Sequence, residues 1–83
     1  MDLLVTYNDA GNSSRGTAII GTISGTSISF GSEYVFNSST TNYTNVAFDP
    51  STAGVFVVTY TDAGNSSAAT AEVGTVSGTS ISF

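Results

Sequence analysis

Cysteine and histidine are both absent from this sequence, and their absence removes several kinds of chemistry at once. No disulfide can crosslink the chain, and no ordinary zinc site can form. Nucleophilic triads that depend on cysteine or histidine are excluded as well. Glycoside hydrolysis would need two opposed carboxylates, and nothing in the spacing suggests that Asp49 and Glu72 meet. We therefore predict that the protein is not an enzyme and holds no cofactor.

Basic residues are almost as scarce, since Arg15 is the only one and lysine is missing. Phosphate backbones and anionic membrane surfaces are bound by clusters of lysine and arginine, so neither nucleic acid nor a membrane is an expected partner. The strongest apolar run, residues 55–58, is far too short to span a bilayer. Residues 1–7 lack the basic start and the apolar stretch of a signal peptide.

What the sequence does contain is a copy of itself. Residues 9–14 read DAGNSS and return as 62–67, and residues 21–30 return with a single change as 74–83. Both pairs are offset by 53 positions, and residues 1–30 match residues 54–83 at 20 of 30 positions without a gap. A fixed period of this length is typical of a supersecondary unit that stacks on copies of itself.

The small size of the chain points to association. A chain of 83 residues forms at most one small domain, which buries only about 60% of its unfolded surface. Neither a disulfide nor a zinc ion stabilises this small core. We therefore expect the chain to associate with copies of itself as a homo-oligomer, or with neighbouring repeats of a longer array.

Short alternating runs of β-branched and aromatic residues, separated by turn residues, predict an all-β fold. In the full repeat, residues 42–83, the predicted strands are 43–48, 55–61, 70–76 and one starting at 79, with turns at 49–54, 62–67 and 77–78. The strand 55–61 is the most apolar and is expected to be buried on both faces. In the first copy the last strand is expected to resume after Gly31 as 33–36. The expected core includes Phe30, Phe36, Phe48, Phe56 and Phe83.

Four antiparallel strands joined as a meander and repeated every 53 residues favour a β-propeller blade. The chain would then hold about one and a half repeats. Strands two to four of one blade would span 1–36, a linking loop 37–42, and a four-stranded blade with a truncated last strand 43–83. Both ends should leave open sheet edges, which are sticky unless paired. A sandwich or solenoid stacking of the same meanders stays open, because the strand pattern within a repeat would look alike.

Two long segments of the sequence resemble a known type of repeat. They are GTAIIGTISGTSISFGSEYVFN, residues 16–37, and AFDPSTAGVFVVTYTDAGNSS, residues 47–67. They are similar to a propeller-like repeat seen in tandem in tail-fibre-like and surface proteins of marine bacteriophages and bacteria. The resemblance covers essentially the whole chain. It implies attachment to a host surface or glycan, from a virion or an extracellular surface, although those proteins usually carry many more repeats.

Two equivalent turns, Tyr7–Ser13 and Tyr60–Ser66, look like part of the Asp-box of sialidase-type propellers, with tyrosine in place of the first serine and no tryptophan. In that family the aspartate caps backbone N–H groups of its own turn, as in an Asx-turn. The resemblance implies a structural role for Asp9, Gly11, Asn12, Asp62, Gly64 and Asn65. Calcium at Asp9 or Asp62 is the alternative, and it is disfavoured because calcium takes six to eight oxygens and several carboxylates. No metal site is predicted.

The tyrosines are the better candidates for ligand binding, because an apolar ring with a polar tip suits stacking on sugars. Tyr7 and Tyr60 lie at equivalent strand ends and are expected in the core or between blades. Tyr34 and Tyr43 flank the expected linking loop and are freer to contact a ligand. The candidate ligand-binding residues are therefore Tyr34, Tyr43, Asn42 and Asn45.

Together these features predict a non-enzymatic repeat module of a phage tail or cell-surface protein. It would assemble with copies of itself and bind host-surface carbohydrate, gaining avidity through many copies. The alternative is a purely structural filament or virion decoration protein, whose open strand edges pair from chain to chain.

Overall fold

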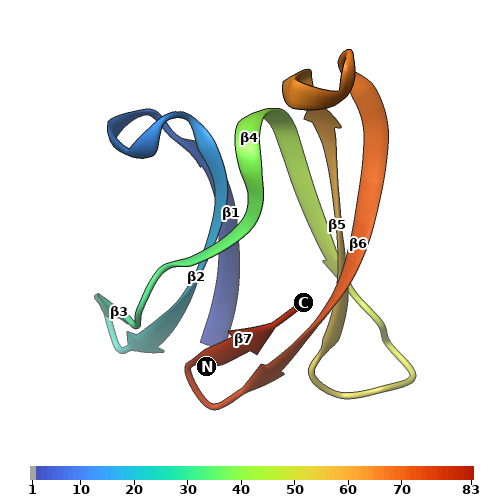
Figure 1. The fold of residues 1–83 in the computed structure, drawn as a ribbon. Helices are drawn as coiled ribbons and strands as arrows, with labels where there is room; N and C mark the ends of the chain where they lie inside the picture. The colour runs from blue at the N-terminus through green and yellow to red at the C-terminus, as the bar shows by residue number, and fades with distance from the viewer. Residues whose placement is uncertain (1) are drawn as a thin grey trace.

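The structure is a computed structural model that describes residues 2–83, and it confirms the predicted all-β class. Every strand pairing in it is antiparallel. The elements in chain order are β1 Asp2–Asp9, the short 3₁₀ turn η1 Ala10–Asn12, β2 Arg15–Ser24, β3 Ser27–Phe30, β4 Tyr34–Phe48, β5 Val55–Asp62, the 3₁₀ turn η2 Ala63–Asn65, β6 Ala68–Ser77 and β7 Ser80–Ser82 (Figure 1).

The strands form one sheet that curls into a half-barrel. Their order is β1-β2-β4-β5-β6-β7, and β3 also pairs with β2. Figure 1 shows β1 and β2 on one side, β5 and β6 on the other, and β4 arching between them. The first part of β4 pairs with β2 and its second part with β5, so this one bent strand joins the two halves.

Strands β3 and β4 follow one another along the same edge of β2. Residues 27–30 pair with 21–24, and residues from Tyr34 onward pair with 15–18. Between them the residues 31–33 break the ladder. The strand of the first copy therefore resumes after Gly31, as the sequence predicts.

The predicted linking loop at 37–42 is wrong, because these residues lie inside β4. Their backbone finds partners on both neighbouring strands: Asn37 pairs with Gly16 of β2, and Thr41 pairs with Asp62 of β5. The polar side chains that suggest a loop bond locally instead. Asn37 Nδ2 donates to Thr41 Oγ1 at 2.9 Å, and Thr41 Oγ1 donates to the Ser39 carbonyl at 2.9 Å. A polar run thus becomes a strand because its side chains are satisfied within the sheet.

The 53-residue period of the sequence recurs in the local structure. We call residues 2–30 the first copy and residues 55–83 the second copy. β1, η1 and β2 have the same bounds as β5, η2 and β6 after the offset. The registers agree as well, since Asp9 pairs with Arg15 in one copy and Asp62 with Ala68 in the other.

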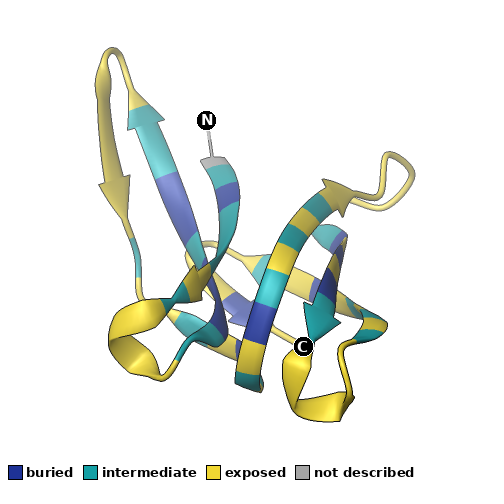
Figure 2. Cartoon of the chain, turned by 90° about the horizontal axis from the view of Figure 1, so that it is seen from above, coloured by how far each residue is buried: buried dark blue, intermediate teal, exposed yellow. Residues whose placement is uncertain are grey.

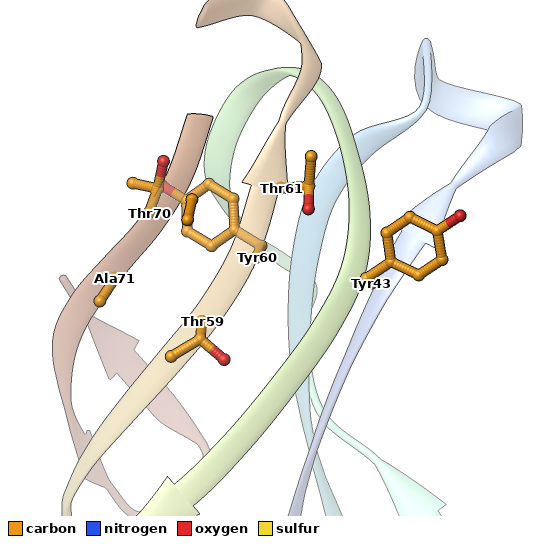
Figure 3. Close-up of a pocket in the computed structure, with 7 residues that line it drawn as sticks. Tyr43, Thr59, Tyr60, Thr61, Thr70 and Ala71 are labelled. Carbon is orange, nitrogen blue, oxygen red and sulfur yellow. The ribbon is translucent and has the colours of Figure 1, made fainter. Parts of the chain in front are cut away.

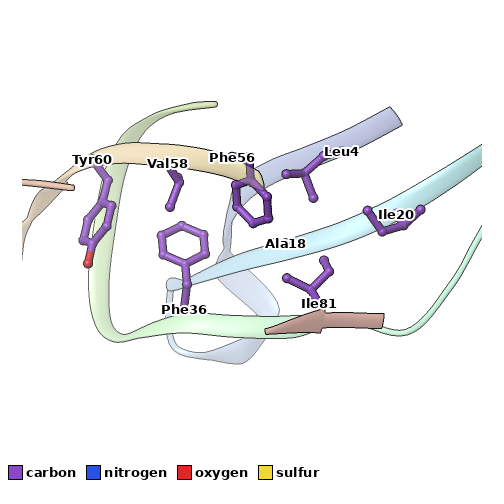
Figure 4. Close-up of a cluster of buried hydrophobic side chains, with 8 residues drawn as sticks. All are labelled: Leu4, Ala18, Ile20, Phe36, Phe56, Val58, Tyr60 and Ile81. Atoms are coloured by element: carbon purple, nitrogen blue, oxygen red, sulfur yellow. The ribbon is translucent and has the colours of Figure 1, made fainter. Parts of the chain in front are cut away.

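The core lies on the concave side of the curled sheet, which we call the inner face (Figure 4). Its buried apolar residues are Leu4, Ala18, Ile20, Phe36, Phe56, Val58, Tyr60 and Ile81. Phe56 is fully buried, and its ring lies over Gly74, where a Cβ atom would come within 2.3 Å of the ring. Burying a side chain of this size stabilises the fold by about 1.5–3 kcal/mol.

On the outer, convex face the residues of β5 and β6 are mostly exposed, and this corrects two predictions about the core (Figure 2). Strand β5 is buried on one face only, because Val57 is 38% exposed while its neighbours Phe56 and Val58 are buried. This alternation is what an antiparallel sheet with one solvated face requires. Among the phenylalanines, Phe36 and Phe56 belong to the core, whereas the other three lie at strand ends or on the short hairpin strand and are about half exposed: Phe30, Phe48 and Phe83.

Candidate functional site

A hollow of about 400 Å³ lies on the second copy, where β4, β5 and β6 meet (Figure 3). The residues that line it are Tyr43, Thr59, Tyr60, Thr61, Ala69, Thr70 and Ala71. The register brings Thr59 opposite Ala71 and Thr61 opposite Ala69, so these four share the outer face. The small alanines on β6 leave the space, and the threonines supply hydroxyl groups that donate and accept hydrogen bonds.

Tyr43 is the most exposed large hydrophobic residue in the described part of the chain, at 84%. Its backbone has φ 55°, in the left-handed region that bulky residues rarely adopt. The cause is a break in the register: Asn42 pairs with Thr61 and Asn45 with Thr59, which leaves two residues of β4 opposite one of β5. Such a bulge redirects a side chain, and here it holds the Tyr43 ring out in solvent beside the hollow.

The structure brings together some of the predicted ligand-binding residues and separates others. Asn42 and Asn45 flank the bulge, and Asn42 Oδ1 accepts a hydrogen bond from Asn8 Nδ2 at 3.4 Å. Asn45 is exposed. Tyr34 begins β4 and packs against the core cluster, so it is not beside Tyr43. Of the four candidates, Tyr43 lines the hollow.

Sequence reasoning missed the rest of the lining, on β5 and β6. A difference between the two copies could have located these residues. The hollow residue Ala69 corresponds to Gly16 in the first copy, and in that copy the equivalent surface is filled. A Cβ atom on Gly16 would lie only 2.7 Å from the Phe36 ring, so the ring occupies the position that corresponds to the hollow.

Strand β4 completes the cover over the first copy. Asn8 Nδ2 donates to the Thr41 carbonyl at 2.7 Å, and Thr44 Oγ1 donates to the Thr6 carbonyl at 3.1 Å. Asn8 and Thr6 correspond to the hollow residues Thr61 and Thr59. The same surface therefore takes a six-membered ring and a polar strand in one copy, and lies open in the other.

The two predicted structural turns differ in detail. In the second copy the Asp62 carboxylate accepts a hydrogen bond from Gly64 N at 3.1 Å, as in an Asx-turn. Asp9 makes no such bond in η1. There, Arg15 Nη1 donates to Asn12 Oδ1 at 3.3 Å.

The glycines and asparagine of these turns differ in their surroundings. Gly64 lies against Ser39 of β4, and a Cβ atom on it would come within 2.3 Å of that side chain, so glycine is required. At Gly11 the nearest atom to a Cβ would be 3.6 Å away, and Asn65 is exposed. Across the described residues, no three acidic, histidine or cysteine side chains gather where a metal ion could be held.

Each copy also contains a tyrosine hydrogen-bonded to a glutamate. Tyr7 donates to Glu33, and Tyr60 donates to Glu72 Oε1 at 2.5 Å. Burial, followed by the hydrogen bond to Glu33 and the charge of that carboxylate, raises the pKa of Tyr7 to about 12. Burial and Glu72 raise the pKa of Tyr60 in the same way. Neither phenol ionises near neutral pH, so both act as hydrogen-bond donors.

No protein-family model matches this chain, and comparisons with curated proteins and with solved structures also find no match. In the described residues, no helix has the length and apolar character needed to cross a membrane.

Proposed function

We propose that the chain is a non-enzymatic repeat module of a phage tail or cell-surface protein, which assembles with copies of itself and binds host-surface carbohydrate. The observation that carries the binding half is the Tyr43 ring, held in solvent by a bulge beside a hollow rich in threonine. An exposed aromatic ring and nearby hydroxyl groups suit a sugar, which can stack its C–H face on the ring and form hydrogen bonds from its hydroxyls to polar side chains.

The first copy indicates which ligand shape would fit the hollow. The position equivalent to the hollow is filled there by the Phe36 ring, which is flat and six-membered. A pyranose ring has a similar size. Ala69 replaces Gly16 in the second copy and takes up part of the space, so the hollow suits a ligand that lies shallow and reaches toward Tyr43.

The architectural half of the proposal is that each 53-residue repeat is a propeller-like blade. The matching bounds and registers of the two copies support a unit that repeats. The bent strand β4 links the two units, since its first part pairs with β2 and its second part with β5. The chain would contribute about one and a half such units to an assembly on a virion or cell surface.

A glycan array tests the binding half directly. The labelled wild-type protein is applied to an array of monosaccharides and oligosaccharides beside the variants Tyr43→Ala, Tyr43→Phe and Tyr43→Trp. We expect binding to a subset of glycans, a loss of about tenfold or more in Tyr43→Ala, and retention in the two aromatic variants. Absence of binding by the wild-type protein, or equal binding by Tyr43→Ala, would refute the carbohydrate role.

A purely structural role is the second candidate, and the strand edges favour it. Within residues 2–83, β1 pairs only with β2, and β6 pairs with β7 only at 75–77. The segment 68–74 of β6, and the outer edge of β1 apart from the Thr6 carbonyl, which accepts from Thr44 Oγ1, therefore present backbone groups that another strand can pair with. Electron microscopy distinguishes the two: long fibres with a cross-β diffraction spacing would favour edge pairing, and discrete particles would favour the module.

A further inference from the structure

The two copies use opposite faces to build the core. Leu4 and Ile20 of the first copy are 8% and 1% exposed, whereas their equivalents in the second copy, Val57 and Val73, are 38% and 60% exposed. The offset of 53 residues relates both pairs. The face of the repeat that is buried in the first copy is thus the open outer face of the second.

The second copy itself covers the first on this face. Leu4 and Ile20 belong to the same buried cluster as Phe56 and Ile81, and Figure 4 shows these side chains converging from β1, β2, β5 and β7. Strand β7 also contacts β2. The second copy therefore packs its Phe56 and Ile81 face on the Leu4 and Ile20 face of the first copy. These two faces are opposite faces of the repeat.

The covering face has its own equivalent in the first copy, and part of it is exposed. Phe56, Val58 and Ile81 correspond to the outer-face residues Leu3, Val5 and Ile28. Leu3 and Val5 are half-buried, and Ile28 is 46% exposed.

This face combines apolar side chains with Tyr7, whose hydroxyl donates to the Glu33 carboxylate. Ile19 stands where the second copy has Glu72, so no carboxylate occupies that position in the first copy. Ile28 lies over Gly21, where a Cβ atom would be 3.0 Å from the isoleucine Cδ1.

We propose that a second copy of this chain docks its Leu3, Val5 and Ile28 face on the Val57 and Val73 face, repeating between chains the packing that joins the two copies within one chain. The inference deepens the assembly half of the proposed function and rests on it. The contact is heterologous, since the two surfaces differ, so chains add head to tail and form a ring or an open fibre.

The docking surface and the carbohydrate hollow are made by different residues. In the first copy the surface equivalent to the hollow is covered by Phe36 and the following residues of β4, and the equivalent of that segment is not supplied by the docking face of another chain. Val57 and Val73 do not line the hollow, which lies toward the η2 end of the same strands. Assembly and sugar binding are therefore separable by mutation.

Sedimentation velocity over a range of concentrations tests the proposal with one variant for each surface, Val73→Lys and Ile28→Lys. Both positions are exposed in the single chain, so both variants should fold, which circular dichroism checks. We expect the wild-type protein to form species larger than a dimer and each variant alone to sediment as a monomer. An equimolar mixture should give a heterodimer that grows no further, because each variant retains the surface that the other lacks.

Three outcomes would overturn this assignment. A wild-type chain that stays monomeric at all concentrations refutes docking altogether. Variants that assemble like the wild-type protein show that other surfaces are used. Self-dimerisation of Ile28→Lys alone shows that the Val73 face pairs with itself. The glycan array, repeated with monomeric Val73→Lys at high density, reports sugar binding separately, so failure of one claim is not read as failure of the other.

Discussion

The hydroxyl of Tyr60 donates a hydrogen bond to Glu72 Oε1 at 2.5 Å across the pair of strands β5 and β6. The equivalent tyrosine of the first copy, Tyr7, also donates to a glutamate, but this is Glu33 from the segment after β3, because the position of Glu72 is held by Ile19. The equivalent tyrosine hydroxyls therefore find their glutamate acceptors at different positions of the repeat. A phenol donor that lost its acceptor would cost free energy in either copy.

Replacement of Tyr60 by phenylalanine removes this hydrogen bond but keeps the buried ring. We expect Tyr60→Phe to lower the free energy of unfolding by about 1–2 kcal/mol, since a hydrogen bond to a charged acceptor is lost. Urea denaturation followed by circular dichroism measures the change. The matched control is Tyr43→Phe, whose hydroxyl lies on an 84% exposed side chain and whose effect should stay within about 0.5 kcal/mol. Equal effects of the two variants would contradict the role of Glu72.

The raised pKa of Tyr7 predicts a loss of stability in strong base. The folded chain holds the phenol proton up to a pKa of about 12, against 10.0 for an ordinary tyrosine, so between these values the folded state binds more protons than the unfolded state. The stabilisation is complete below pH 10 and falls as the pH rises through about 12. Tyr60, whose pKa is also raised, adds to this effect.

Urea unfolding at pH 9 and at pH 11.5 measures this dependence. The double variant Tyr7→Phe, Tyr60→Phe should be less stable at pH 9 but lose less stability between the two pH values than the wild-type protein. A wild-type protein and a double variant with the same pH slope would contradict the assignment.

Gly74 lies where the ring of Phe56 crosses β6. A Cβ atom there would come within 2.3 Å of the ring, so we expect Gly74→Ala to destabilise the fold by about 1–3 kcal/mol through overpacking. The control is Gly11→Ala, where the nearest atom would be 3.6 Å away and no positive φ opposes alanine. Thermal unfolding should give Gly74→Ala a midpoint temperature well below that of Gly11→Ala. The reverse order would show that Phe56 does not occupy this position.

The two turns give a matched pair of substitutions. Asp62 accepts a hydrogen bond from Gly64 N, whereas Asp9 makes no side-chain bond to its own turn. We expect Asp62→Ala to cost about 0.5–2 kcal/mol and Asp9→Ala less, since only the first removes a cap. Amide hydrogen exchange at Gly64 provides a local readout, and it should rise in Asp62→Ala alone. Faster exchange in both variants would indicate that Asp9 contributes from a distance.

The sequence predicts local structure here better than it predicts burial. The 53-residue offset, the turns at 49–54 and 62–67 and the strands of the second copy all correspond to observed elements. Burial depends on which face meets another element, and the repeat itself hides this. Leu4 and Val57 occupy the same position in the repeat, yet one is buried and the other is exposed, because the second copy covers the first and none of residues 2–83 covers this face of the second.

The candidate site likewise depends on contacts between strands that the sequence does not show. The sequence shows Tyr43 as an aromatic residue within a polar run. Its exposure, however, results from a register break between β4 and β5, and the residue types at this position do not predict that break. The hollow beside it depends on small residues of β6, which read in the sequence as ordinary strand positions. The comparison of Gly16 with Ala69 was the available signal, and it needed the position of Phe36 to be interpreted.

Cysteine crosslinking between chains tests the head-to-tail docking most directly, because the protein contains no cysteine of its own. The single variants Ile28→Cys and Val73→Cys are treated with a short bismaleimide, first separately and then as an equimolar mixture. The docking predicts covalent heterodimers in the mixture and little crosslinking in either variant alone. Homodimers of Val73→Cys as abundant as the mixed product, or no crosslinked product in the mixture, would contradict it.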